Sequence, residues 1–344
     1  MTIVGRSHED VLADLDSWCS ERPLPATPSA ELTSVVSGPL LDLPFPGRGR
    51  TWTRFRALAA LGSYDLSVAR LAEGHADALA ILAEAGHECV PTQSVLGVWA
   101  AGPLSTLTAD RAGGDWQLNG IRRWCSGARA LSHALVTASV GQLCRLFLVD
   151  VQVTGISVVP DTWPAVGMAG SQTFDVRFDQ VHLQDGAAVG GEDFYLNRPG
   201  FWHGAIGVAA VWWGGARAAA RPLLVRKDGA SPHRLAHAGA VRARLWSMET
   251  TLRTAARRID QDPSDSRSEA RALAAVVRHL VESDASEILE RVGRATGAEP
   301  LGHDAAHARR VADLTVYLRQ SHAEADLAAL ETHMLDGGTL RGWS

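Results

Sequence analysis

The spacing of apolar positions divides the chain into three stretches with different periods. Up to about residue 93, apolar residues recur at helical spacing, and Gly86 stands where a helix stop is expected. The period then becomes two, and it returns to helical spacing after about residue 196. The pattern predicts an N-terminal helical domain, a middle β domain and a C-terminal helical domain, at 1–92, 93–195 and 196–344.

The first stretch predicts helices over 8–20, 52–61 and 66–85. The middle stretch predicts short strands within 116–121, 133–139, 144–150 and 155–159. In TFDVRFDQVHL (173–183), Phe174, Val176 and Phe178 share one face, whereas Val181 and Leu183 continue on the opposite parity. This change of parity predicts a β-bulge near Asp179 and Gln180. Short strands with closely spaced turns are typical of a small β-barrel or sandwich.

The third stretch predicts a C-terminal four-helix bundle. Residues 205–225 are apolar on nearly all sides, as in a helix buried between neighbours, and Gly214-Gly215 favours close helix packing. Three amphipathic helices are predicted at 233–260, 268–297 and 304–335, and a polar linker at 261–267 separates two antiparallel helices. The predicted fold is therefore multi-domain α+β.

Composition narrows the class of protein. The 344 residues carry a formal net charge of −5, with 46% hydrophobic and 21% charged residues, as in ordinary globular proteins. No basic stripe suggests nucleic-acid binding. The most apolar run, 205–216, is shorter than the roughly 20 residues that span a bilayer. The charged N-terminus and the absence of CxxC pairs predict a cytoplasmic protein with free thiols at Cys19, Cys89, Cys125 and Cys144.

Four segments, in this order, resemble the acyl-CoA dehydrogenase family: LAALGSYDLSVARLAEGH (58–75), DWQLNGIRRWCSGA (115–128), VGMAGSQTFDVRFDQVHL (166–183) and HARRVADLTVYLRQSH (307–322). The resemblance covers roughly residues 55–335. It implies the same order of helices, strands and four-helix bundle, an FAD cofactor and a homo-oligomer paired through the C-terminal domain. It also implies an acyl thioester or a related small molecule as substrate.

Candidate flavin contacts lie in the middle stretch. A flavin needs a hydroxyl or amide near N5 and an apolar or aromatic wall against its ring. The resemblance implies that Trp124 lies against the ring and that Ser126 contacts N5. The two residues are two apart on a segment expected to be extended, so both would project to one side. Trp99 and Ala101 are further candidates, and the alternative is a core tryptophan and a turn serine.

Three segments depart from the family pattern. The stretch GVWAAGPLST (97–106), which contains Trp99 and Ala101, lacks the acid of the family's loop that holds substrate and flavin. The segment VRKDGASPHRL (225–235) keeps Arg226 but lacks the Phe-Gly of the segment that reaches the partner's FAD. TGAEP (296–300) stands in place of a Gly-rich turn. We therefore expect weaker flavin binding than is usual for the family.

The usual catalytic carboxylate is missing. Dehydrogenation beside a thioester needs a carboxylate to take the α-proton, and the resemblance places it at Ser321 or, alternatively, near Gly204 or Ala205. None of these side chains accepts a proton. On a continuous helix, Glu324 and Asp326 would point elsewhere. His322 adjoins the vacated position and is the candidate acid or base, because the unperturbed pKa of an imidazole lies near neutrality. The alternative is a histidine on a helix surface.

Other histidines give a weaker signal. His303 and His307, like His233 and His237, are spaced i, i+4, but there is no third ligand and no HExxH sequence, so no metal site is predicted. Three functions stay open at this point. They are an acyl-CoA dehydrogenase-like oxidoreductase, a flavin monooxygenase of the same fold using His322, and a non-catalytic homologue acting as a subunit or scaffold.

Overall fold

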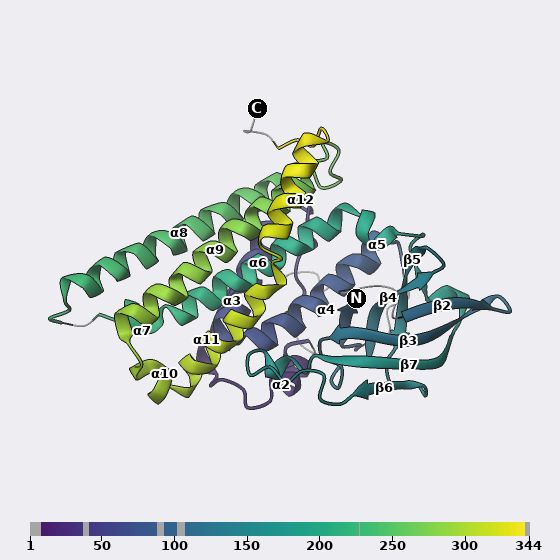
Figure 1. Cartoon of the computed structure of the whole chain (residues 1–344), viewed down its shortest axis with the longest axis horizontal. Coiled ribbons are helices and arrows are strands. Elements are labelled where there is room, and N and C mark those ends of the chain that lie inside the picture. Colours follow the sequence, from purple (N-terminus) through teal and green to yellow (C-terminus); the bar gives the residue numbers. More distant parts are fainter. Residues whose placement is uncertain (1–7, 37–40, 88–92, 102–106, 227, 341–344) are drawn as a thin grey trace.

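The computed structural model describes residues 8–36, 41–87, 93–101, 107–226 and 228–340. Helices form one side of the molecule and a β-sheet forms the other (Figure 1). The order is helices, then strands, then helices, as the hydrophobic periods predicted.

Four helices precede the first strand: α1 (His8–Glu21), α2 (Pro28–Val36), α3 (Thr51–Tyr64) and α4 (Leu66–Glu84). The Asp65 side chain caps α4 by accepting a hydrogen bond from the Val68 amide at 2.9 Å. Gly86, at a φ of 65°, follows the end of α4 as predicted. The predictions for α1, α3 and α4 are confirmed.

The described strands form one eight-stranded mixed sheet in the order β6-β7-β3-β2-β4-β5-β8, and β1 pairs with β4. Their bounds are β1 Leu96–Trp99, β2 Leu107–Ala112, β3 Asp115–Cys125, β4 His133–Val140, β5 Leu143–Asp150, β6 Ile156–Val159, β7 Phe174–Leu183 and β8 Ala188–Val189. The predicted bulge is confirmed. The register of β3 with β7 shifts between Leu118 and Gly120, and Gln180 has a φ of 50°. The shift keeps Phe178 and Val181 both buried.

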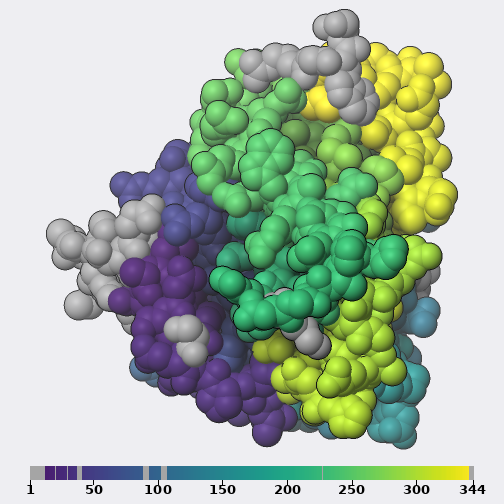
Figure 2. Space-filling view, turned by 90° about the vertical axis from the view of Figure 1, so that its left-hand side faces the viewer, coloured from purple at the N-terminus to yellow at the C-terminus, as the bar shows by residue number. Residues whose placement is uncertain are grey.

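The remaining helices are α5 Phe194–Asn197, α6 Pro199–Ala219, α7 Arg221–Leu224, α8 Pro232–Gln261, α9 Ala270–Thr296, α10 Glu299–His303, α11 Ala305–Tyr317 and α12 Glu324–Leu335; short 3₁₀ turns are η3 Ala169–Ser171, η4 Asp185–Ala187 and η5 Leu318–Gln320. Figure 2 shows the molecule from the helical side, away from the sheet. There α8, in green, lies between the N-terminal helices, in purple, and the C-terminal end, in yellow.

The prediction of one continuous helix over 304–335 is wrong. The chain leaves the helix after η5, and Ala323 has a φ of 48°. The Asp326 carboxylate then accepts a hydrogen bond from the His322 amide at 3.0 Å, at the start of α12. The break has a tertiary cause, since α11 packs on α6 and α4 whereas α12 packs on α9.

Helix α6 is the central element of the helical side, packed against α3, α4, α8, α9 and α11. A Cβ atom at Gly214 would lie 2.0 Å from the Ala59 carbonyl oxygen, so the backbones of α6 and α3 are in contact. The prediction that these glycines allow close packing is confirmed. Helix α3, from the N-terminal stretch, therefore shares one hydrophobic core with the C-terminal helices.

Two predictions from composition bear on this structure. Across the described part of the chain, no helix combines the length and apolar character needed to cross a membrane. Cys19, Cys125 and Cys144 are free thiols, and Cys89 lies outside the described residues.

Candidate active site

Trp99 and Ser126 are brought together at the edge where the sheet meets α4. The indole Nε1 of buried Trp99 donates a hydrogen bond to the Ser126 carbonyl at 2.9 Å. The next residue, Gly127, has a φ of 72° and lies so close to Leu71 of α4 that a Cβ atom would meet its methyl group at 3.0 Å. The turn after β3 is therefore held by both β1 and α4.

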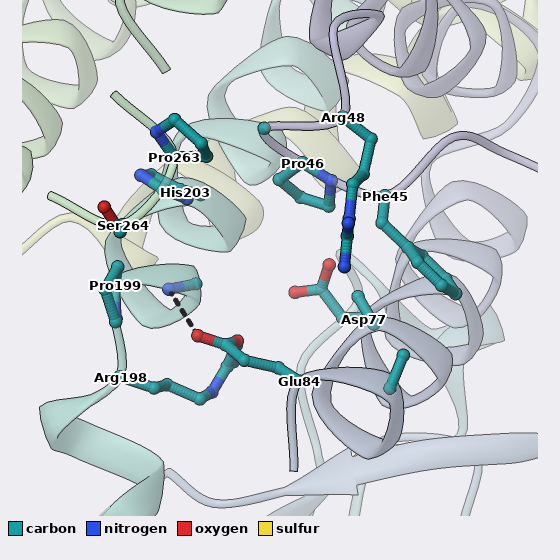
Figure 3. Close-up of a pocket in the computed structure, with 14 residues that line it drawn as sticks. Phe45, Pro46, Arg48, Asp77, Glu84, Arg198, Pro199, His203, Pro263 and Ser264 are labelled. Carbon is teal, nitrogen blue, oxygen red and sulfur yellow. Dashed lines mark hydrogen bonds and ion pairs between the residues drawn. The ribbon is translucent and has the colours of Figure 1, made fainter. Parts of the chain in front are cut away.

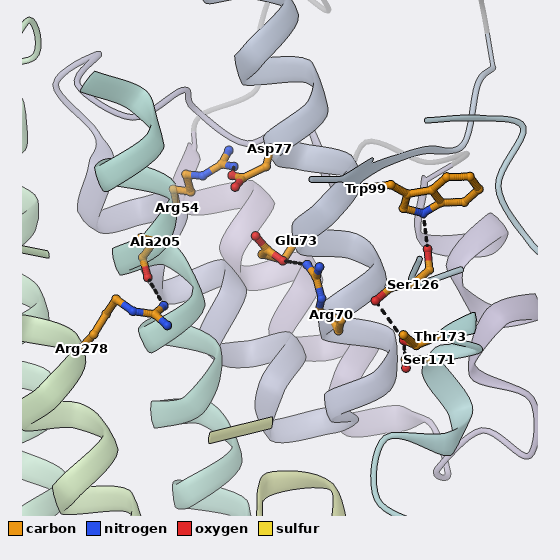
Figure 4. Close-up of polar contacts among 10 residues, drawn as sticks. All are labelled: Arg54, Arg70, Glu73, Asp77, Trp99, Ser126, Ser171, Thr173, Ala205 and Arg278. Carbon is orange, nitrogen blue, oxygen red and sulfur yellow. Dashed lines mark hydrogen bonds and ion pairs between the residues drawn. The ribbon is translucent and has the colours of Figure 1, made fainter. Parts of the chain in front are cut away.

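A chain of hydroxyl groups runs inward from Ser126 (Figure 4). Its Oγ lies 3.0 Å from Thr173 Oγ1, which lies 2.8 Å from Ser171 Oγ. Ser171 Oγ donates to the Met168 carbonyl at 2.7 Å. Thr173 and Ser171 are not among the site residues predicted from the sequence, although both belong to the segment 166–183 that carries the resemblance.

The directions of these hydrogen bonds follow from counting protons, because each hydroxyl has one proton to donate. Ser171 gives its proton to a carbonyl, so Thr173 must donate to Ser171 and Ser126 must donate to Thr173. The Ser126 oxygen is left with lone pairs for any outside group. In this arrangement Ser126 is a hydrogen-bond acceptor toward a ligand.

Trp124 lies differently from the prediction. The register of β3 with β7 shifts between Arg122 and Cys125, and Trp124 has a φ of 57°, so the segment is not a regular extended strand. Ser126 comes after the strand, in a turn, and the alternation argument for a shared side therefore fails. The Trp124 side chain is 46% exposed, and its backbone amide donates to Asp175 at 3.3 Å. Positive φ is rare for a large aromatic residue, and backbone strain of this kind is concentrated at functional sites.

These residue types fit a flavin. The exposed indole of Trp124 offers an aromatic surface, and the half-buried Ser126, two residues further along the chain, offers a polar atom. Arg129 follows in the same turn, lies over Phe174 at 4.5 Å and has no carboxylate partner in the part of the chain that the structure describes. Its cation is suited to a flavin phosphate. Ala101 is exposed and its carbonyl accepts a hydrogen bond from Arg122, while 102–106 lie outside the described residues.

His322 lies in the break before α12. Its side chain is 74% exposed, and Nδ1 lies 3.2 Å from Asp326 Oδ1. Both residues line a cavity of about 380 Å³, together with Trp202, Arg271 and Arg278. The expectation that Asp326 points elsewhere is wrong, because the helix on which it was based is broken. Ser321 is half-buried, and its Oγ accepts a hydrogen bond from the Ala323 amide at 3.3 Å.

The two positions where the family's carboxylate was expected are linked by Arg278 of α9. Its guanidinium donates to the Ala205 carbonyl at 2.9 Å (Figure 4). It also donates to the Gln320 carbonyl at 2.9 Å. Burial lowers the pKa of Arg278. The start of α6 and the segment before Ser321 are thus held together by a cation, and no carboxylate occupies either position.

Carboxylates are instead found on α4. Arg54 of α3 donates to Asp77 Oδ1 at 2.7 Å, and Arg70 forms an ion pair with Glu73 (Figure 4). Glu73 and Asp77 lie one helical turn apart on the same helix. Burial raises the pKa of Glu73 to about 7, against the opposing effect of Arg70. This cluster is not among the sites predicted from the sequence, although charged residues at this spacing on an otherwise apolar helix were a visible signal.

A second cavity of about 550 Å³ adjoins Asp77, between α4 and the start of α6 (Figure 3). Arg198 donates to Glu84 at 2.7 Å at its edge. His203 of α6 is 4% exposed, and burial lowers its pKa. This imidazole is therefore neutral near pH 7.

The other sequence candidates among the described residues do not line either of the two cavities. Arg226 pairs with Asp228 at 3.2 Å, and both side chains are almost fully exposed. Among the residues described, no group of three or more His, Cys, Asp or Glu side chains is arranged to hold a metal ion. His307 is buried, whereas His303 is exposed.

Comparisons with known proteins agree with this architecture. Residues 94–181 match the acyl-CoA dehydrogenase middle domain, and no curated protein matches the sequence significantly. Dibenzothiophene monooxygenase from Paenibacillus sp. A11-2 is 18% identical, with a TM-score of 0.82 over 97% of this chain and 98% of that one. The same enzyme has been solved with FMN and indole.

Two further solved structures share the fold. Methanesulfinate monooxygenase from Pseudomonas fluorescens is 19% identical, with a TM-score of 0.78 over 97% of both chains. Butyryl-CoA dehydrogenase from Megasphaera elsdenii is 14% identical, with a TM-score of 0.79 over 97% of this chain and 100% of that one. At these identities the likeness establishes a common fold.

Proposed function

We propose that this acyl-CoA dehydrogenase-like chain is a flavin-dependent oxidoreductase that uses reduced flavin and oxygen to act on a small organic molecule. The observation that carries the proposal is the hydroxyl chain from Ser126 through Thr173 to Ser171. Two of the similar structures named above are monooxygenases, which supports this chemistry over dehydrogenation.

The hydroxyl chain favours one redox form of the flavin. Oxidised flavin N5 accepts a hydrogen bond, whereas N5–H of reduced flavin donates one. Because Ser126 already donates inward to Thr173, its oxygen is suited to accept from N5–H. A bound reduced flavin supplies the electrons that activate oxygen. Ser126 would orient the ring, and Trp124 would cover one face of it.

The structure gives dehydrogenation of acyl chains less support. The positions of Ser321, Gly204 and Ala205 hold no carboxylate. Arg54 of α3 forms a charged cluster with Glu73 and Asp77 of α4, where an apolar acyl chain would have to displace hydrogen-bonded ions. A substrate with polar groups is better matched to this interior.

The test is a titration of the purified protein with FMN and FAD, each in oxidised and dithionite-reduced form. We expect tighter binding of the reduced forms. Thr173→Val removes the acceptor for the Ser126 proton and should narrow the difference between the two redox forms. Trp124→Ala should weaken the binding of both the oxidised and the reduced flavin. The proposal fails if no flavin form binds saturably, and that outcome would favour the non-catalytic subunit or scaffold.

A second proposal concerns His322 and its role in the oxygen-dependent reaction. The Asp326 carboxylate at 3.2 Å orients its imidazole beside the cavity lined by Trp202 and Arg278. Indole, which the Paenibacillus enzyme binds with FMN, is a suitable probe. His322→Ala should lower indole-dependent turnover with reduced flavin without changing flavin affinity. Equal turnover in the two proteins would remove His322 from the mechanism.

The choice of flavin and the assembly remain predictions. FAD was expected from the family resemblance, whereas FMN is the flavin in the Paenibacillus structure, so the titration compares both.

We propose a homodimer or larger oligomer, in which the 70% exposed Trp246 of α8 contributes to the contact. Light scattering should give at least twice the monomer mass, and Trp246→Glu should lower it. The domain boundaries at 92/93 and 195/196 and the cytoplasmic location also stay predictions.

A further inference from the structure

The carboxylates of Asp77 and Glu84 on α4 face two glycines of α6, Gly204 and Gly200. A Cβ atom at Gly204 would lie 2.7 Å from Asp77 Oδ2, and one at Gly200 would lie 2.2 Å from Glu84 Oε2. Gly200 and Gly204 are one helical turn apart, so they clear one continuous strip. The glycines leave room for the carboxylates where larger residues would exclude them.

The two oxygens of Asp77 have different surroundings. Oδ1 accepts a hydrogen bond from Arg54 at 2.7 Å, whereas Oδ2 is the oxygen nearest to Gly204. Asp77 also lines the cavity of about 550 Å³. Arg54 therefore holds the Asp77 carboxylate in place through Oδ1. The other oxygen, Oδ2, is left to accept a hydrogen bond from a ligand in the cavity.

Glu73 and Asp77 lie one helical turn apart on α4, and each has an arginine partner: Glu73 pairs with Arg70, and Asp77 pairs with Arg54. Burial raises the pKa of Glu73, and the nearby charge of Asp77 raises it further. The charged or titratable groups around the pair are Arg48, Arg54, Arg70, Tyr195, Arg278 and Tyr317. The buried Tyr317 hydroxyl and Arg54 Nη1 have no partner among the described residues.

The rest of the cavity wall is mixed. Phe45, Pro46, Pro199 and Pro263 supply apolar surface, and Figure 3 shows Arg48 directed toward the same space as Asp77. His203, neutral near pH 7, adds a polar group that carries no charge. The cavity thus combines an apolar wall with two carboxylates. Both oxygens of Glu84 accept hydrogen bonds, from Arg198 and from the Gly200 amide, whereas Oδ2 of Asp77 faces Gly204.

We propose that this cavity binds the substrate and that Asp77 selects a small molecule with an apolar body and an O–H or N–H group. The proposal rests on the proposed function, because it identifies the substrate class of the same oxidoreductase. Asp77 Oδ2 accepts the hydrogen bond of that group, and Gly204 leaves the approach to it open. The carboxylate missing at the start of α6 is thus replaced, as a recognition group, by one that reaches across from α4.

The experiment compares phenol with anisole, its methyl ether, which has the same ring but no hydroxyl proton. Dissociation constants are measured by calorimetry on the flavin-loaded wild-type protein. We expect phenol to bind roughly tenfold or more tightly than anisole, as for a hydrogen bond to a charged acceptor. Failure of phenol to bind, or equal affinity for the two ligands, overturns the proposal.

Asp77→Asn tests the residue. Arg54 holds Oδ1, so an amide would present its NH₂ group to the cavity and could not accept the phenol proton. The preference for phenol should fall to roughly equal binding. Asp284→Asn is the matched control, since Asp284 is also buried and ion-paired, with Arg244 at 3.1 Å between α8 and α9. It should keep the wild-type preference, and an unchanged preference in Asp77→Asn overturns the proposal.

Gly204→Ala is a second test that leaves every charge in place. The added methyl would lie 2.7 Å from Asp77 Oδ2, so the carboxylate must move or lose its access to the cavity. Phenol binding should weaken while anisole binding changes less, and an unchanged phenol affinity contradicts the proposal. Flavin titration of the same samples separates the two proposals. Selective phenol binding without flavin binding would contradict the proposed function alone, and flavin binding without selectivity would contradict this inference alone.

Discussion

Asp313 of α11 accepts a hydrogen bond from the backbone amide of Met168 at 2.5 Å, across 145 residues of sequence. Met168 has a φ of 59°, and its neighbour Gly167 lies so close to α11 that a Cβ atom would be 2.2 Å from the Ala312 carbonyl oxygen. Arg309 pairs with Asp65, the cap of α4, and lies 3.9 Å from Asp313. The contact therefore joins the sheet side, through the segment that carries Ser171 and Thr173, to the helical side.

Asp313→Ala should destabilise the protein by about 2–3 kcal/mol, because it leaves the buried Met168 amide without an acceptor. Urea-induced unfolding measures the change. Asp228→Ala is the matched control, since its ion pair with Arg226 is almost fully exposed, and it should stay within about 0.5 kcal/mol of wild type. Equal effects of the two substitutions would show that the Met168 contact contributes no stability.

Gly214→Ala should destabilise the protein strongly, by roughly 2 kcal/mol or more, because α3 and α6 would have to separate. Gly239→Ala on α8 is the control. No atom lies within 4 Å of a Cβ at Gly239, so alanine should stabilise the exposed helix by about 0.5–1 kcal/mol. The midpoint temperature of thermal unfolding should fall for Gly214→Ala and rise for Gly239→Ala. A neutral Gly214→Ala would contradict the close contact with Ala59.

His75 should make the free energy of unfolding depend on pH. Its Nδ1 accepts a hydrogen bond from the Leu96 amide at 3.0 Å, and burial lowers its pKa to about 4 from 6.5. Because the folded pKa is depressed, the stabilisation is fully present above pH 6.5 and is lost as the pH falls toward 4. The loss should be on the order of 2–3 kcal/mol.

His75→Asn provides the comparison for this pH dependence, because asparagine keeps an acceptor but does not titrate. Urea unfolding between pH 7 and pH 4 should show a shallower decline for the variant than for wild type. Parallel declines would mean that His75 is protonated in the folded protein without cost.

Butyryl-CoA should be oxidised very slowly or not at all by the wild-type protein, since Ser321 stands where a general base is needed. Losing such a base costs about 10²–10⁴-fold in rate. Ser321→Glu should raise flavin reduction by butyryl-CoA, measured anaerobically at the flavin absorbance, whereas Ser321→Gln should not. Oxidation by wild type at an ordinary enzymatic rate would show that the family position is not Ser321, or that another group acts as base.

Local sequence alone determined most elements of this protein. Hydrophobic period separated helices from strands, the parity change after Phe178 located the bulge at Gln180, and Gly86 marked the end of α4. These features depend on residues that are neighbours along the chain, so their physical causes are visible in the sequence. The resemblance likewise singled out Trp99 and Ser126, which the structure joins by a hydrogen bond.

Tertiary structure decided the features that depend on distant partners. The break at Ala323 contains no Gly or Pro, and it arises because α11 and α12 pack on different helices. The left-handed conformation of Trp124 accompanies a register shift between β3 and β7. Asp77 could not be recognised as a candidate, because its surroundings depend on Gly204, which lies on another helix. Such a group takes its hydrogen-bond partners and its access to ligand from residues remote in sequence, and only folding brings these together.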